Sequence, residues 1–224
     1  MDQNANSLTK QYEFRFSKSL VYRQRVWKIL CNDFFARYIP QNSVVLDLGA
    51  GWGEFVNNIV AAEKYALDLN ADTGIQVSTN VKFTQQDCAQ KWPNYNESLD
   101  IVFTSNFLEH LPDKACVQST IAEAHRCLKP GGLLICLGPN IKYVPGAYWD
   151  FWDHNIPLTE LSLAEVLKLC GFNIIESIPK FLPYSMSNDA RLPPLIFVRL
   201  YLRMPFVWSI FGKQFLVIGQ KTKL

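Results

Sequence analysis

The chain has 224 residues, of which 49% are hydrophobic and 19% are charged, and these proportions exclude a disordered or collagen-like protein. Its 22 basic and 20 acidic residues give a net charge of +2 and form no basic block, so we do not expect a nucleic-acid partner. Six cysteines lie apart, with no C-x-x-C pair, which favours free thiols in a cytoplasmic protein. The length favours one folded domain.

The first part of the chain predicts a tail, a helix and a strand, in that order. Residues 1–19 are polar and lack the apolar run of a secretory signal, so we interpret them as a flexible tail before a single domain at 20–224. Residues 20–38 place apolar side chains at helical spacing, and a proline follows. The apolar run at 43–49 predicts a strand, followed by glycines and a helix over 54–63.

Strands and helices then alternate along most of the chain. Alternation of this kind predicts an α/β fold, in which a parallel sheet is covered by helices on both faces. The count is about seven strands in one domain. The further strands are expected at 64–70, 81–87, 98–106, 131–139, 173–182 and 213–221, and the further helices at 114–128 and 159–172.

Two stretches break this alternation. Residues 139–158 contain prolines and many aromatic side chains, which indicates a long functional loop inserted after a strand. Residues 193–211 are apolar on nearly every side of a helix, but Arg199, Arg203 and prolines interrupt them, so we do not expect a helix that spans a membrane. Burial or a homodimer contact is one interpretation of this segment. A cap over an apolar acceptor, or a peripheral contact with a membrane, is the other.

Three glycines follow the first predicted strand in the sequence VLDLGAGWGEF at 44–54. Glycine permits backbone angles that a Cβ forbids, and it lets a ligand approach the main chain closely. The spacing is G-x-G-x-G, not the G-x-G-x-x-G of dinucleotide-binding proteins, and Asp47 precedes Gly49 by two residues. An acid beside the loop suits a cationic ligand better than a pyrophosphate. A structural turn without a ligand is the alternative interpretation.

Further acids follow the next two predicted strands. Asp68 ends the second strand, where a carboxylate can accept hydrogen bonds from both hydroxyls of a ribose. Asp87 follows the third strand, with Cys88 beside it, and can bond the edge of a nucleobase. Each of these acids could instead be solvated at a strand end. We expect a structural role for Glu109, after the fourth strand, and either pocket lining or packing for His110.

Several motifs in this order resemble the class I S-adenosylmethionine-dependent methyltransferases, in their type 11 subgroup. They are D-x-G-x-G-x-G at 47–53, the two acids, SLDIVFTSNFLEHLPD at 98–113 and LKPGGLLI at 128–135. The resemblance covers about 44–221 and implies a Rossmann-like, doubly wound sheet of seven strands, mostly parallel with an antiparallel terminal strand. It also implies S-adenosylmethionine as cofactor, with contacts from Asp47, Gly49, Ala50, Gly51, Gly53, Asp68, Leu69, Asp87, Cys88 and Ser105.

The aromatic loop at 139–158 opens onto the same edge of the sheet as the glycine loop, so it is expected to bind the methyl acceptor. His154 is the candidate general base because imidazole titrates near neutral pH, and Asp150 or Asp153 could orient it. His154 could instead only brace the loop. The side chains expected to contact the acceptor are Tyr143, Tyr148, Trp149 and Trp152.

The sequence therefore predicts a methyltransferase that uses S-adenosylmethionine on a small-molecule, sugar or lipid-linked acceptor, with methylation at oxygen as the leading reaction. No paired acids follow the fourth strand, so no metal ion is predicted. A nucleotide-binding oxidoreductase and a non-catalytic, cofactor-binding scaffold protein are the alternative functions. The acceptor and the oligomeric state are not predicted.

Overall fold

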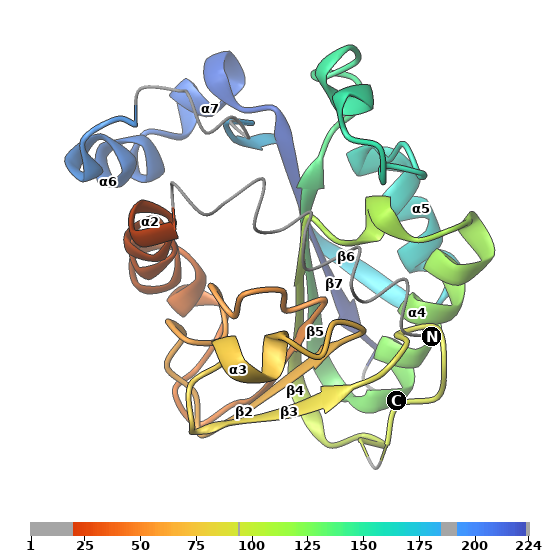
Figure 1. Cartoon of the computed structure of the whole chain (residues 1–224). Helices are drawn as coiled ribbons and strands as arrows, with labels where there is room; N and C mark the ends of the chain where they lie inside the picture. The colour runs from red at the N-terminus through yellow and green to blue at the C-terminus, as the bar shows by residue number, and fades with distance from the viewer. Residues whose placement is uncertain (1–19, 94, 185–191, 223–224) are drawn as a thin grey trace.

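A seven-stranded β-sheet runs through the middle of the molecule (Figure 1). The computed structural model describes residues 20–93, 95–184 and 192–222. The strands lie in the order β3-β2-β1-β4-β5-β7-β6, and β7 is antiparallel to both of its neighbours while the other pairs are parallel. This confirms the predicted sheet. The strands are β1 (Val44–Leu48), β2 (Glu63–Asp68), β3 (Val81–Gln85), β4 (Leu99–Ser105), β5 (Leu128–Pro139), β6 (Phe172–Leu182) and β7 (Gln214–Lys221).

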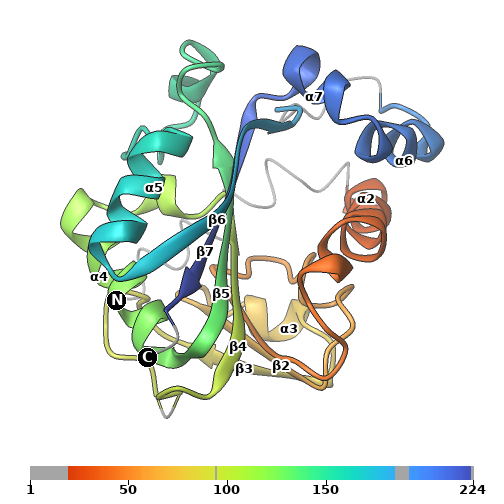
Figure 2. The ribbon, with the colours of Figure 1, turned by 180° about the vertical axis from the view of Figure 1, so that it is seen from behind.

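Helices cover both faces of this sheet, and each face has its own hydrophobic core (Figures 1 and 2). In β1, Leu46 and Leu48 belong to one core while Val45 belongs to the other, as the two-residue period of a strand requires. One face carries α4 (Lys114–Cys127) and α5 (Glu160–Leu169). The other carries α2 (Leu20–Asp33), α6 (Leu195–Arg203) and α7 (Pro205–Phe211). The remaining helical elements are η1 (Phe35–Arg37), α3 (Thr73–Gln76), η2 (Leu108–His110) and η3 (Ala147–Asp150).

The helix predicted over 54–63 is wrong, because the chain forms irregular turns there before β2 begins at Glu63. Side chains take the backbone groups that a helix would use. Asp47 accepts the N–H of Val56 at 3.3 Å, Lys64 donates to the carbonyl of Val56 at 2.9 Å, and Asn58 donates to that of Glu54 at 2.8 Å. Side chains that compete for backbone groups in this way favour turns over a regular helix.

Of the two remaining predicted segments, the structure describes only the second. The tail at 1–19 lies outside the described residues. The apolar segment at 193–211 forms α6 and α7, two short helices that meet at Met204. Among the residues that the structure describes, no helix is both long enough and apolar enough to cross a membrane.

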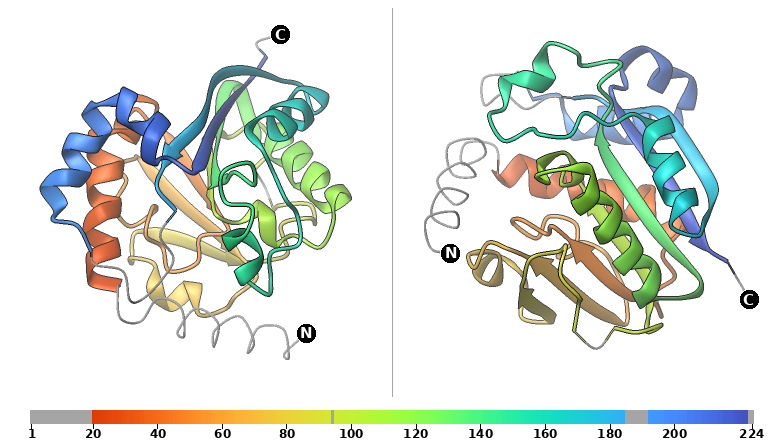
Figure 3. Two further views of the ribbon diagram at one scale, coloured as in Figure 1. Left: turned by 90° about the horizontal axis from the view of Figure 1, so that it is seen from above. Right: turned by 90° about the vertical axis from the view of Figure 1, so that its right-hand side faces the viewer.

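The glycine loop lies where β1 ends, next to the end of β4 (Figure 3). The strand order reverses between these two strands, and a crevice for ligands is expected at such a point. Gly49, Gly51 and Gly53 all have positive φ, between 53° and 70°, which L side chains rarely adopt. A Cβ on Gly49 would lie 2.3 Å from the ring of Phe107. At Gly49, therefore, both the backbone conformation and the lack of space require glycine.

Replacing Gly49 by alanine should destabilise the fold and disturb the loop. The left-handed backbone costs an alanine about 1–2 kcal/mol, and the contact with Phe107 adds an overpacking cost of about 1–3 kcal/mol. Chemical denaturation should show this loss as a lower midpoint. Gly146→Ala is the matched control, because its φ is −81° and no atom lies within 4 Å of the position that its Cβ would take, so its midpoint should stay close to that of the unchanged protein. Equal midpoints for both variants would contradict the conclusion that position 49 requires glycine.

Candidate active site

A cavity of about 620 Å³ opens at the edge of the sheet where β1, β2 and β4 end. Both the glycine loop and the loop after β5 contribute to its wall, so the topology brings the predicted cofactor residues and part of the predicted acceptor loop together. Gly53 is the predicted cofactor residue that does not line it; its N–H donates to the carbonyl of Ala50 inside the loop. The cofactor residues that do line it are Asp47, Gly49, Ala50, Gly51, Asp68, Leu69, Asp87, Cys88 and Ser105.

Asp68 connects the end of β2 to the glycine loop. One carboxylate oxygen accepts the N–H of Gly51 at 2.8 Å, and the other accepts that of Asn70 at 2.8 Å. Burial raises the pKa of Asp68, and these N–H groups partly offset the effect. Each carboxylate oxygen can accept a second hydrogen bond, so Asp68 can hold the loop and still receive hydroxyl groups from a ligand in the cavity.

Acidic side chains gather at the glycine-loop end of the cavity. Asp47 is buried, and burial raises its pKa well above the usual range; the N–H of Val56 lowers it in part, while the charges of Asp68 and Glu54 raise it further. Glu54 also lines the cavity and pairs with Arg23 of α2, with nitrogen–oxygen distances of 2.6 and 2.8 Å. A cationic ligand would relieve the mutual repulsion of these carboxylates.

Helix α2 forms a wall of the site that was not predicted from the sequence. Arg23 and Trp27 of this helix both line the cavity, although they precede the glycine loop by more than twenty residues. No motif spacing links the two segments. A signal was present only in the composition of the helix, where an arginine and a tryptophan lie one helical turn apart.

The loop at 139–158 contributes fewer residues than predicted. Trp152, Asp153 and His154 line the cavity, while the other four candidate residues do not. Tyr148 is fully buried and its hydroxyl donates to the carbonyl of Ile156, so it supports the loop from the core. Trp149 and Asp150 are exposed, and Tyr143 lies under the ammonium group of Lys180, 4.5 Å from its ring centre.

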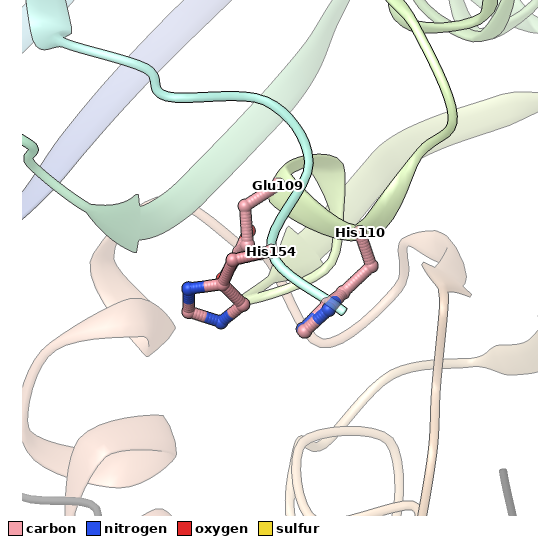
Figure 4. A group of neighbouring side chains, drawn as sticks. All are labelled: Glu109, His110 and His154. Atoms are coloured by element: carbon pink, nitrogen blue, oxygen red, sulfur yellow. The ribbon is translucent and has the colours of Figure 1, made fainter. Parts of the chain in front are cut away.

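Backbone hydrogen bonds hold this loop against η2, which follows β4. The N–H groups of Asn155 and Ile156 donate to the carbonyl of Glu109 at 2.8 and 3.0 Å, and the side-chain amide of Asn155 donates to the carbonyl of His110 at 3.2 Å. As a result, Glu109, His110 and His154 lie side by side at the cavity (Figure 4). The two imidazole rings are 4.8 Å apart, centre to centre.

Asp153 pairs with His110, not with its neighbour His154 as the sequence suggested. The Nδ1 atom of His110 lies 3.2 Å from a carboxylate oxygen of Asp153 and 3.1 Å from its carbonyl oxygen. Because both oxygens are acceptors, Nδ1 carries the proton and Nε2 of a neutral ring keeps the lone pair. Burial alone would lower the pKa of His110, but Asp153 and Glu109 outweigh it and raise the pKa above its ordinary value.

Glu109 was expected to be structural, yet it lines the cavity and is buried. Burial raises the pKa of Glu109, and the nearby His110 lowers it in part. Glu109, His110 and His154 each offer a metal-ligand atom, and these atoms lie within 4.8 Å of one another. The arrangement can accept protons from a bound molecule or hold a divalent ion, since imidazole and carboxylate are zinc ligands. The sequence did not indicate this group because His154 comes from a distant loop.

Comparison with known proteins assigns the chain to a family. The methyltransferase-domain family named Methyltransf_23 matches residues 20–177; its number differs from the type 11 subgroup that the motifs suggested. The ubiquinone/menaquinone biosynthesis C-methyltransferase UbiE of Rickettsia peacockii is 31% identical over an alignment of 178 residues, and the match covers 69% of this chain and 60% of that protein. The chain thus spans about 60% of the length of the curated relatives it matches.

Solved structures share the fold. A methyltransferase dependent on S-adenosylmethionine from Archaeoglobus fulgidus is 20% identical with a TM-score of 0.64, and the match covers 95% of this chain and 98% of that one. The N-methyltransferase NodS of Bradyrhizobium japonicum, in complex with S-adenosyl-L-homocysteine, is 14% identical with a TM-score of 0.57, covering 80% and 78%. The chain therefore belongs to the methyltransferase-domain family Methyltransf_23, and it shares the fold of solved methyltransferases that depend on S-adenosylmethionine.

Proposed function

We propose that the protein methylates a hydroxyl oxygen of a small, sugar-linked or lipid-linked acceptor. The observation that carries this proposal is that one cavity joins the glycine loop to the paired His110 and Asp153. Family membership argues against the oxidoreductase alternative. It leaves the substrate open, because methyltransferases of one fold act on many acceptors.

The glycine-loop end of the cavity fits the cofactor. The acids around Asp47 suit a ligand with positive charge. Asp68 and Asp87 line the same cavity, which supports roles for them as acceptors of hydrogen bonds from a ribose and an adenine. When bound, S-adenosylmethionine supplies an electrophilic methyl group on a positively charged sulfur. The protein contributes by orienting its ligands and excluding water.

We assign proton acceptance to His110 and acceptor contact to His154. His154 was the candidate base from the sequence, but it is the Nδ1–H of His110 that donates to Asp153, which leaves Nε2 of the His110 ring as the basic atom. An orienting carboxylate behind an imidazole is the arrangement that general-base catalysis uses. His154 packs beside His110 and stacks on Phe151, so its ring has a fixed position in the cavity wall. Asp150 has no role in this proposal.

Apolar side chains also line the cavity. Phe103, Phe107, Leu111 and Pro112 are among them, and Trp152, which is 92% exposed, lines it as well. These side chains favour an acceptor with an apolar or aromatic body and one ionisable hydroxyl.

Methylation at carbon is the second candidate, and the names of the curated relatives favour it. Removal of a proton from an aromatic hydroxyl also makes the carbons of the ring nucleophilic, so the same base would serve both reactions. Transfer of a ¹³C-methyl group to hydroxylated aromatic acceptors, followed by NMR of the product, distinguishes an O-methyl from a C-methyl signal. Binding of the cofactor without any transfer would favour the scaffold alternative.

Asp68→Asn should weaken the binding of S-adenosylmethionine by roughly 10- to 100-fold, because hydrogen bonds to a charged acceptor contribute about 1.5–3 kcal/mol. Isothermal titration calorimetry with S-adenosylmethionine and S-adenosylhomocysteine measures this change. Asp150→Asn removes a carboxylate outside the cavity and serves as the control, with unchanged affinity expected. Unchanged affinity in Asp68→Asn would refute the role of Asp68 in cofactor binding.

Asp153→Asn should move the acidic limb of the activity profile to lower pH. A base must be neutral, so activity rises with pH through the pKa of His110, and Asp153 raises that pKa. Its removal therefore lowers the pKa of His110 and the pH at which activity appears. Steady-state kcat measured between pH 5 and about 9 shows the shift.

His110→Asn removes the proposed base itself, so its kcat should fall by about 100-fold or more.

Two results would contradict the assignment of His110 as the base. An unmoved acidic limb in Asp153→Asn, together with a larger loss of kcat in His154→Asn than in His110→Asn, would make His154 the base. Loss of activity in EDTA that a divalent ion restores would instead identify Glu109, His110 and His154 as ligands of a metal ion.

A further inference from the structure

The helices α6 and α7 expose an apolar surface at one end of the molecule. Their inner sides hold Leu202 and Trp208, which are buried in the core beneath them. Isolated exposed apolar residues are common, but a group of them on two consecutive short helices forms a patch that needs an explanation. The outer side chains, between 42% and 71% exposed, are Ile196, Phe197, Leu200, Phe206, Ile210 and Phe211.

Positive charge accompanies this patch. Residues 192–213 contain Arg199, Arg203 and Lys213, and neither aspartate nor glutamate. Of these residues, Arg199 lies 3.4 Å from a carboxylate oxygen of Asp33 in α2, which holds α6 against that helix. An apolar surface bordered by basic side chains is typical of elements that rest on anionic membranes.

A groove of about 350 Å³ lies between α2 and α6, beside the patch. Ile29, Leu195 and Ile196 contribute apolar lining, while Arg25, Lys28 and Arg199 supply cationic groups. The combination suits a phosphate headgroup with the first part of an acyl chain.

The loop that carries η3 stands at the same end of the molecule as α7, on the other side of the sheet, as Figures 1 and 2 show. Trp149 and Trp152 of this loop are 58% and 92% exposed. Tryptophan prefers the interface between water and lipid. Trp152 also lines the cavity, so a flat surface that touches both α7 and this loop would lie close to the cavity entrance.

We propose that α6 and α7, with the groove beside α2, dock the protein onto an anionic phospholipid bilayer. The apolar side chains of the patch enter the interfacial layer, the basic side chains meet lipid phosphates, and Trp149 and Trp152 form a second contact. Docking of this kind presents the cavity to molecules within the membrane. It does not depend on which atom of the acceptor is methylated.

Vesicle flotation of the full chain tests this docking directly. We expect binding to vesicles that contain phosphatidylglycerol, at least tenfold weaker binding to phosphatidylcholine alone, and a further decrease at high salt. Phe206→Ser with Ile210→Ser should reduce binding to the anionic vesicles at least tenfold. Ile75→Ser with Leu169→Ser is the matched control. These two side chains are 81% and 73% exposed, but they lie on α3 and at the end of α5, outside the patch. The control variant should bind the anionic vesicles as well as the unchanged protein does.

The outcomes separate docking from the proposed reaction. Thermal unfolding and S-adenosylmethionine binding show whether each variant is folded, and neither reports on the membrane. Equal vesicle binding by the patch and control variants, or no binding by the unchanged protein, would overturn the proposal. A dimer by light scattering that becomes a monomer in the patch variant would assign the surface to a second copy of the chain instead.

Arg203→Gln with Lys213→Gln should reduce the preference for anionic lipid by at least fivefold.

Discussion

The site depends on a short piece of backbone pairing. The N–H groups of Asn155 and Ile156 both donate to the carbonyl of Glu109, and these bonds hold the loop after β5 against η2 after β4. Tyr148 strengthens the same contact from the core through its hydrogen bond to Ile156. Because two segments more than forty residues apart are joined in this way, two histidines and two acids can share one wall of the cavity.

Charge is distributed unevenly along the cavity. Carboxylates concentrate at the glycine-loop end, where burial raises the pKa of both Asp47 and Asp68. The imidazole of His110 lies toward the other end, paired with Asp153. Buried carboxylates without a counter-ion are costly, so the first end gains from a cationic ligand, while the second end is suited to removing a proton from a neutral one. This division agrees with the two substrates of a methyltransferase.

The two sides of helices α6 and α7 have different roles. Trp208 packs against the aromatic rings of Phe34 and Phe181 in the core, which anchors α7 to the sheet. The outer sides of the same helices are apolar and basic. Burial, as the sequence suggested, therefore describes only half of the segment. The exposed half connects the fold to the proposed membrane surface.

The sheet, and the acids that meet at one edge of it beside the glycine loop, could be derived from the sequence alone. The strands could be predicted because each is a short apolar run bounded by turns, and Asp47 and Asp68 could be placed because residues at the ends of adjacent parallel strands meet at one edge. The helix expected over 54–63 could not be excluded, because Asp47 and Lys64 reach its backbone only in the folded chain. Only the tertiary structure decided that Asp153 pairs with His110, that Tyr148 faces the core and that Arg23 reaches the cavity. The physical reason is that the sheet itself places residues at the ends of neighbouring strands, whereas the other contacts depend on how loops and helices distant in sequence pack together.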